Sequence, residues 1–244
     1  LGFTEFSVLE RFFLEKNIKK IVMLYGGRVA TDSDNGIDLE LIESCFEVFH
    51  KANIEKVLVA SSAAVYADKD GEIYSEDDPI SDYGAYQKEK VNLEALSKTF
   101  SDKFEDLLLM RLSNVLGADS LTKLFVYSKN HDFLLNKYKN GFLKRSYLSP
   151  SSFAHVIHEL LYLDCKLPRV MNISTYQELS MDQILNGLGV SFREKTIQSA
   201  GRNVILDTSL LESLFELPSE YSDVNFALAD LNAYKLWVGD KINE

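Results

Sequence analysis

The order of apolar and polar positions along the chain predicts helices and strands in alternation. Apolar side chains at helical spacing mark the helices, whereas short apolar runs without alternation are typical of strands buried on both faces of a parallel sheet. An aspartate, Asp38, is expected to cap the second helix. Helices are therefore expected over residues 5–16, after Asp38 and over about 85–104, and strands over residues 21–25, 57–60 and 107–110.

Alternation of this kind predicts an α/β fold built on a doubly wound parallel sheet. Ligands of such sheets bind beyond the carboxyl ends of the strands. The positions that follow the three strands are Gly26 and Gly27, Ser61 and Ser62, and Ser113 and Asn114. After residue 120 the pattern loosens, and a helix near 151–163, a strand at 170–173 and a helix near 181–188 indicate a smaller lobe.

Composition and charge narrow the classes of function. With 244 residues, 46% of them hydrophobic, the chain can bury a full core. A formal net charge of -11 argues against a nucleic-acid backbone or an anionic membrane as the main partner. No apolar run approaches the roughly 18 residues of a membrane span, and no signal-peptide pattern opens the chain. We therefore expect a cytoplasmic protein.

Two further features concern side-chain chemistry. The 2 cysteines, Cys45 and Cys165, fall within apolar helical patterns, so buried reduced thiols are expected. Residues 137–145 form a basic cluster, which suits either a small anionic ligand or a solvated surface. His155 and His158 stand three apart on a predicted helix, but no second ligand cluster appears, so no metal site is expected.

Tyr86 and Lys90 are spaced so that a helix places both side chains on one face. A phenol has a pKa of about 10 in solution, and a nearby ammonium lowers it by favouring the phenolate. The phenol can then exchange a proton with a carbinol or carbonyl oxygen. A hydroxyl at a strand end, that of Ser62, can hydrogen-bond the same oxygen. These groups suit hydride transfer with a redox cofactor.

The Tyr-x-x-x-Lys spacing by itself carries little weight. A chain with 12 tyrosines contains about one such match by chance. A second match, Tyr162 to Lys166, follows no strand that ends in serine, so we interpret it as the chance match.

Three segments in order give a stronger signal: "LVASSAAVYADKDG", "PISDYGAYQKEKVNLE" and "LLLMRLSNVLG". Together they resemble the extended short-chain dehydrogenase/reductase family of nucleotide-sugar epimerases, dehydratases and reductases. The matching positions are Ser61 to Tyr66, then Tyr86, Lys90 and Glu94, then Arg111, Asn114, Val115 and Gly117.

The resemblance implies a fold, ligands and residue roles. It implies a partial Rossmann-like dinucleotide-binding domain over residues 1–120 and, over 121–244, a mixed segment that returns to the sheet and forms a substrate-binding lobe. NAD or NADP is the implied cofactor, a nucleotide-diphosphate sugar the partner, and a homodimer the assembly. Tyr86 would be the acid/base, Lys90 its electrostatic partner and a ribose ligand, and Ser62 would hold the reacting oxygen. The remaining implied contacts are Gly26, Gly27 and Ser61, with Tyr86 and Lys90, at the cofactor, and Asn114 near the substrate. Lys144 and Arg145, from the basic cluster at residues 137–145, are the further residues expected to bind the substrate.

The chain also departs from the family pattern. The glycine-rich loop that binds the pyrophosphate is missing; Leu1 falls at about the end of the third family strand. We expect the missing part, about two βα units, to lie upstream, although a natural protein without the loop is the alternative. The latter favours a second hypothesis, a non-catalytic binding or regulatory protein.

Two alanines help to choose the reaction. Sugar 4,6-dehydratases of this family carry Asp-Glu where this chain has Ala63 and Ala64, and fucose-synthase-like enzymes carry a cysteine at the second position. Chemistry at one carbon remains, by a 4-keto-sugar reductase or a 4-epimerase. With the missing part restored, a length of about 300 residues resembles the dTDP-4-dehydrorhamnose reductase branch and favours the reductase.

Overall fold

The computed structural model describes residues 3–25, 38–69, 71–127 and 133–242, in two compact units. The first unit comprises residues 1–67, 77–111 and 160–171, and the second comprises 68–76, 112–159 and 172–244. The chain passes between the units several times. The domain limits expected from the sequence, 1–120 and 121–244, stay a prediction.

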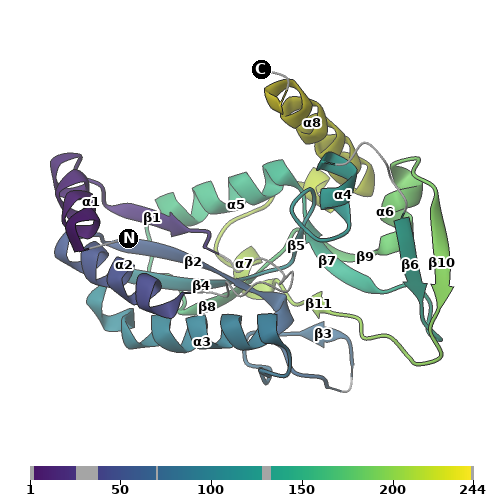
Figure 1. Ribbon diagram of the computed structural model, residues 1–244, viewed down its shortest axis with the longest axis horizontal. Coiled ribbons are helices and arrows are strands. Elements are labelled where there is room, and N and C mark those ends of the chain that lie inside the picture. Colours follow the sequence, from purple (N-terminus) through teal and green to yellow (C-terminus); the bar gives the residue numbers. More distant parts are fainter. Residues whose placement is uncertain (1–2, 26–37, 70, 128–132, 243–244) are drawn as a thin grey trace. The chain divides into compact units, whose positions relative to one another are not determined.

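The first unit is built on a four-stranded sheet of order β1-β2-β4-β8 (Figure 1). Its strands are β1 (Lys20–Met23), β2 (Lys56–Ser62), β4 (Asp106–Leu112) and β8 (Val170–Ile173). β1 and β2 run parallel, with Ile21 opposite Val57. β2 and β4 are buried along almost their whole length, which is why residues 57–60 and 107–110 within them form continuous apolar runs. The predicted α/β fold with a parallel sheet is confirmed.

Three helices of this unit follow the predicted order: α1 (Phe3–Glu15), α2 (Leu39–Lys51) and α3 (Ala85–Thr99). The Asp38 side chain caps α2 by accepting a hydrogen bond from the Leu41 backbone N–H at 3.0 Å, as predicted. Figure 1 shows α2 and α3 side by side along the sheet. The core between them includes Phe46, which stacks on Phe100 at a centroid distance of 5.0 Å.

Two expectations for this unit are wrong. The helix expected to reach residue 104 ends at Thr99, and a separate 3₁₀ turn, η2 (Ser101–Lys103), follows it. Cys165 is exposed and lies in a bend after α5 (Pro150–Tyr162), whereas Cys45 is partly buried within α2. Because α5 ends at Tyr162, the spacing from Tyr162 to Lys166 does not bring these side chains to one helical face.

The second unit contains short strands and several helices around a separate core. Its strands form three small sheets: β5-β7-β9, in which β7 and β9 are antiparallel, and the parallel pairs β10-β6 and β11-β3. The strands are β3 (Ile73–Tyr74), β5 (Asn114–Val115), β6 (Phe133–Lys137), β7 (Lys144–Leu148), β9 (Tyr176–Ser180), β10 (Phe192–Thr196) and β11 (Ile205–Leu206). The helices are α4 (Thr122–Tyr127), most of α5, α6 (Met181–Gly187), α7 (Ser209–Glu212), the 3₁₀ turn η3 (Ser219–Ser222) and α8 (Val224–Ile242).

A single apolar core holds the second unit together. It includes Tyr147 from β7, Leu179 from β9, Ile184 from α6 and Leu231 from α8. Gly187 lets α6 approach α8 closely, because an added Cβ would lie 2.3 Å from a methyl carbon of Leu228. None of the helices in the described part of the chain combines the length and the apolar character needed to cross a membrane.

Candidate active site

The ammonium group of Lys90 is held at the carboxyl end of the sheet of the first unit. Lys90 lies on α3 and is 3% exposed. Its Nζ donates hydrogen bonds to the carbonyl oxygen of Ala60 in β2, at 3.0 Å, and to that of Tyr25, which follows β1, at 3.4 Å. Two adjacent strands therefore fix one cation at the place where parallel sheets bind ligands.

Burial changes the acidity of this cation. Desolvation lowers the pKa of Lys90 from its ordinary 10.5 to about 8, while the carboxylates of Glu89 and Glu94 act in the opposite direction. The Lys90 ammonium is consequently still mostly protonated at neutral pH, but it loses its proton as the pH rises through about 8.

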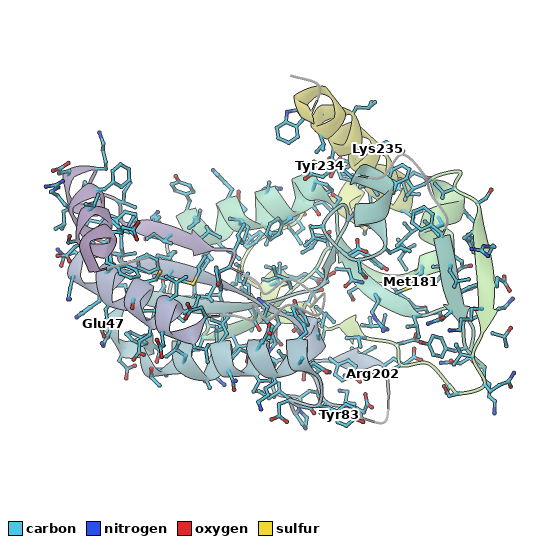
Figure 2. All side chains as sticks on the ribbon, in the orientation of Figure 1. Glu47, Tyr83, Met181, Arg202, Tyr234 and Lys235 are labelled. Carbon is cyan, nitrogen blue, oxygen red and sulfur yellow. The ribbon has the colours of Figure 1, made fainter. Side chains whose placement is uncertain are left out.

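Tyr86 lies one helical turn before Lys90, on the same face of α3. The residue is 36% exposed, so part of it is open to solvent. Tyr83 precedes the Gly84 cap of α3 and is 94% exposed. Its side chain is labelled in Figure 2. The two tyrosines of this short stretch thus occupy different settings, and Tyr86 alone shares a helical turn with Lys90.

Ser62 ends β2 and caps the 3₁₀ turn η1 (Ala63–Val65). Its Oγ accepts a hydrogen bond from the Ala64 backbone N–H at 3.2 Å. A hydroxyl that accepts in this way still carries a hydrogen that it can donate. Ala63 and Ala64 follow it directly in η1. These are the two positions at which the 4,6-dehydratase pattern described above has Asp-Glu.

Ser61 has a different environment. Its Oγ donates to Oε1 of Glu94 at 2.6 Å, inside the protein. Glu94 also accepts two hydrogen bonds from Arg111, at 3.1 and 3.0 Å. The hydroxyl of Ser61 is therefore engaged internally, and its cofactor contact stays a prediction. Glu94 and Arg111 are motif residues to which sequence reasoning gave no role. Gly26 and Gly27 lie outside the described residues.

Asn114, the first of the predicted substrate residues, belongs to the second unit. It lies in β5, opposite Tyr147 of β7. The Tyr147 hydroxyl is buried and makes no hydrogen bond of normal geometry to the described residues, although Asn114 lies close enough to influence it. Burial raises the pKa of Tyr147, Asp119 raises it further, and Asn114 partly opposes both.

Lys144 and Arg145 start β7 and differ in their partners. Lys144 is exposed and forms an ion pair with Glu178, which raises its pKa. Arg145 donates hydrogen bonds to the backbone carbonyls of Lys144 and Arg202. Burial lowers the pKa of Arg145, and the nearby Arg202 adds to this effect. Arg202, labelled in Figure 2, was missed by sequence reasoning because it lies far from residues 137–145 in the chain.

The comparisons with known proteins agree with these motifs. The profile of the NAD dependent epimerase/dehydratase family matches residues 1–147. The chain belongs to this family. No protein of curated function matches its sequence significantly.

Several solved structures of NAD-dependent epimerases and dehydratases have a similar fold. One is UDP-glucose-4-epimerase from Stenotrophomonas maltophila with bound NAD and formylated UDP-arabinopyranose (TM-score 0.76, 14% identity, 96% of this chain and 81% of that chain). Another is the NAD-dependent NDP-hexosamine 5,6-dehydratase of tunicamycin biosynthesis (0.75, 18%, 93% and 80%). A third is UDP-glucose 4-epimerase from Bifidobacterium longum with NAD+ and UDP (0.72, 17%, 94% and 80%). The expected cofactor, NAD or NADP, agrees with the family.

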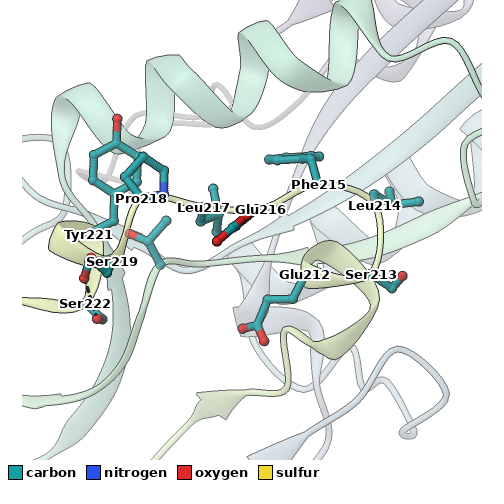
Figure 3. A pocket seen from close by; sticks show the side chains of 11 residues that line it. Glu212, Ser213, Leu214, Phe215, Glu216, Leu217, Pro218, Ser219, Tyr221 and Ser222 are labelled. Carbon is teal, nitrogen blue, oxygen red and sulfur yellow. Dashed lines mark hydrogen bonds between the residues drawn. The ribbon is translucent and has the colours of Figure 1, made fainter.

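One pocket of the second unit is lined by residues that the sequence did not predict as site residues. A pocket of about 520 Å³ in the second unit is lined by Thr175 and by residues 212–219, 221 and 222 (Figure 3). No residue predicted for catalysis or cofactor binding lines it. Nearby, His155 Nδ1 and the Tyr221 hydroxyl share a hydrogen bond of 2.9 Å. Among the residues that the structure describes, no group of three or more His, Cys, Asp or Glu is arranged to hold a metal ion.

Proposed function

We propose that this protein interconverts an alcohol and a ketone at one carbon of a nucleotide-diphosphate sugar, with NAD or NADP as the redox partner and Tyr86 as the acid/base. The observation that carries the proposal is the buried ammonium of Lys90, which the Ala60 carbonyl fixes one helical turn from the partly exposed Tyr86. Membership of the NAD dependent epimerase/dehydratase family supports it.

The residues present fit a nicotinamide nucleotide at this end of the sheet. An ammonium has three N–H donors, and acceptors among the described residues are Ala60 and Tyr25. One donor is thus left for a hydroxyl such as that of a ribose. When bound, the nicotinamide would supply or accept the hydride.

The protein's own groups would handle the proton. The Tyr86 phenol would give a proton to a carbonyl oxygen in reduction, or take one from a carbinol in oxidation. The positive charge of Lys90 favours the phenolate in the latter case. Ser62 would donate its remaining hydrogen to the same oxygen as negative charge develops there. Its bond from Ala64 N–H holds the hydroxyl in position.

The two residues after Ser62, Ala63 and Ala64, favour chemistry at a single carbon. Dehydration needs a further acid and base, and Ala63 and Ala64 provide neither. Two reactions remain. Net reduction of a 4-keto sugar is the first candidate, and epimerisation at the same carbon is the second.

Replacing Tyr86 with phenylalanine tests the assignment. Removing a general acid/base is expected to reduce turnover by about 10²- to 10⁴-fold, while binding of the dinucleotide, measured by fluorescence titration, remains. Tyr83→Phe is the matched control, because Tyr83 precedes the same helix and is 94% exposed. Native-like turnover by Tyr86→Phe would contradict the proposal. Failure of the native protein to bind either dinucleotide would instead favour a non-catalytic binding protein.

One assay separates the two reactions. The protein is given a nucleotide-diphosphate-4-keto sugar with NADH or NADPH, and separately a UDP-hexose with NAD+. Stoichiometric consumption of reduced cofactor indicates the reductase. Inversion of the UDP-hexose without net change in cofactor absorbance indicates the epimerase.

A further inference from the structure

A set of buried polar side chains lies next to Lys90 in the first unit. Ser61 Oγ donates to Oε1 of Glu94 at 2.6 Å, and the Arg111 guanidinium donates to both carboxylate oxygens, from Nε at 3.1 Å and from Nη2 at 3.0 Å. Glu94 is 0% and Arg111 3% exposed. The guanidinium also lies over the ring of Tyr66, with its Cζ 4.8 Å from the centroid. These contacts join β2, α3 and β4.

A buried ion pair is an expensive way to hold three elements together. Desolvation of two charges offsets most of their attraction, and apolar residues of the same size often stabilise a fold equally well. Burial on its own lowers the pKa of Arg111, but the hydrogen bonds and charge of Glu94, together with a smaller effect of Tyr66, outweigh it and keep that pKa above its usual value. Stability alone is therefore a poor reason for the presence of this pair.

Position suggests another reason. Glu94 lies one helical turn after Lys90 on α3, and its partner Ser61 is the neighbour of Ser62 on β2. The carboxylate thus touches the strand that carries Ser62 and sits on the helix that carries Tyr86. Its negative charge also acts on the Lys90 ammonium.

We propose that Glu94 and Arg111 form a positioning pair that fixes α3, and with it the ammonium of Lys90, against the end of β2. The inference rests on the proposed function only because that function assigns Lys90 a role beside Tyr86. The effect of the pair on the position and the titration of Lys90 does not depend on turnover. Neither residue is placed in contact with substrate or cofactor.

The charged groups around Lys90 make the inference testable, because removing Glu94 or Arg111 should shift the titration midpoint of Lys90 in opposite directions. Glu89 and Glu94 act on it from its own helix, and Arg111 acts from β4 through Glu94. From β2 and from the end of β1 it meets neutral carbonyls, those of Ala60 and Tyr25. Removing the Glu94 charge leaves the Arg111 cation uncompensated, and this disfavours the Lys90 ammonium. Removal of the Arg111 charge leaves an uncompensated anion and favours it.

The experiment measures the titration midpoint of Lys90 directly. Protein labelled with ¹³C at lysine Cε is titrated by NMR, and Lys90→Met identifies the resonance. Glu94→Gln is expected to lower the midpoint by about one pH unit, and Arg111→Met to raise it. Disruption of packing alone would move both midpoints in one direction. Equal midpoints in all three proteins, or shifts of the same sign, would overturn the proposal.

Removing one partner of a buried pair is destabilising, so charge-preserving variants complete the design. If the two variants above do not fold, Glu94→Asp decides, since it withdraws the carboxylate by one methylene. It is expected to lower the Lys90 midpoint, and an unchanged midpoint would overturn the proposal. Arg111→Lys is the matched variant on the other side of the pair. Absence of turnover in the native protein would contradict the proposed function alone, because the NMR titration needs no substrate.

Discussion

Replacing Lys90 with methionine is expected to change how stability depends on pH. The folded protein holds the Lys90 pKa at about 8, because the group is desolvated, while the unfolded chain restores a value near 10.5. Between these two values the unfolded chain binds more protons than the folded one, so the free energy of unfolding rises with pH. The contribution is fully present above 10.5 and is lost as the pH falls through 8.

The size of the effect follows from the shift. Each unit of pKa difference corresponds to about 1.4 kcal/mol, so the whole shift corresponds to about 3 kcal/mol. Roughly 2 kcal/mol of it develops between pH 7 and pH 9.5. The measurement is the difference in free energy of unfolding between native protein and Lys90→Met, from urea denaturation at each pH. Taking the difference cancels every group that titrates alike in both proteins.

A matched control and a clear contrary result accompany this prediction. Lys88→Met removes an exposed lysine from the same helix, and its difference from the native protein is expected to stay constant across the same range. A pH-independent difference in free energy of unfolding between Lys90→Met and the native protein is not evidence for or against this prediction, since that variant also loses the hydrogen bond to the Ala60 carbonyl. Parallel curves for the native protein and Lys90→Met between pH 7 and 9.5 would show that burial does not perturb this ammonium.

Two further substitutions test the first unit by urea denaturation. Asp38→Ala removes the side chain that caps α2 at the Leu41 N–H and is expected to cost about 1 kcal/mol, whereas Asp38→Asn, which can still cap, should cost far less; equal losses would contradict the capping role. Lys56→Met removes a buried ammonium that donates to the carbonyls of Leu160, at 3.2 Å, and Leu163, at 2.9 Å, beside Asp106. Among the residues that the structure describes, the buried Asp106 carboxylate then keeps only the Leu167 N–H, at 3.0 Å, and the exposed Lys166, at 3.9 Å. A loss of about 3 kcal/mol is therefore expected, and a loss below about 1 kcal/mol would contradict it.

The first unit was largely predictable from the sequence because its strands are buried on both faces. The predicted runs, residues 57–60 and 107–110, lie within β2 and β4 and are apolar segments that no other local structure explains as well. The Asp38 cap was predictable because it needs only residues close in sequence. The helix after residue 85 was predicted too long, since Phe100 and Phe104 continue its apolar pattern while belonging to the core beyond its end.

The second unit was mostly unpredictable for the opposite reason. β10 exposes nearly all of its side chains, so it carries no apolar signal. Its hydrogen bonds are made with β6, where Phe192 pairs with Phe133 across a long separation in the chain. β5 and β11 have two residues each, too few for any periodicity. Such strands are determined by tertiary contacts rather than by local pattern.

The two halves of the candidate site differ in the same way. Tyr86 and Lys90 could be paired from spacing alone, because a helix fixes the geometry of residues four apart. Glu94 binds Ser61, 33 residues earlier, and Arg111, 17 residues later, and no local rule connects them. The family motif included all three residues, but only the structure shows that they touch.

The contact between Ser61 and Glu94 gives the two adjacent serines, Ser61 and Ser62, different roles. Successive residues of a strand point to opposite faces, so two adjacent serines cannot serve one ligand with both side chains. Ser61 donates inward to Glu94, and Ser62 turns out of the strand to cap η1. The buried serine ties β2 to the charged pair on α3 and β4, while its neighbour keeps a hydrogen to donate. A strand end with two serines thus combines an anchor with a candidate ligand group, and replacing either one is expected to have a different consequence.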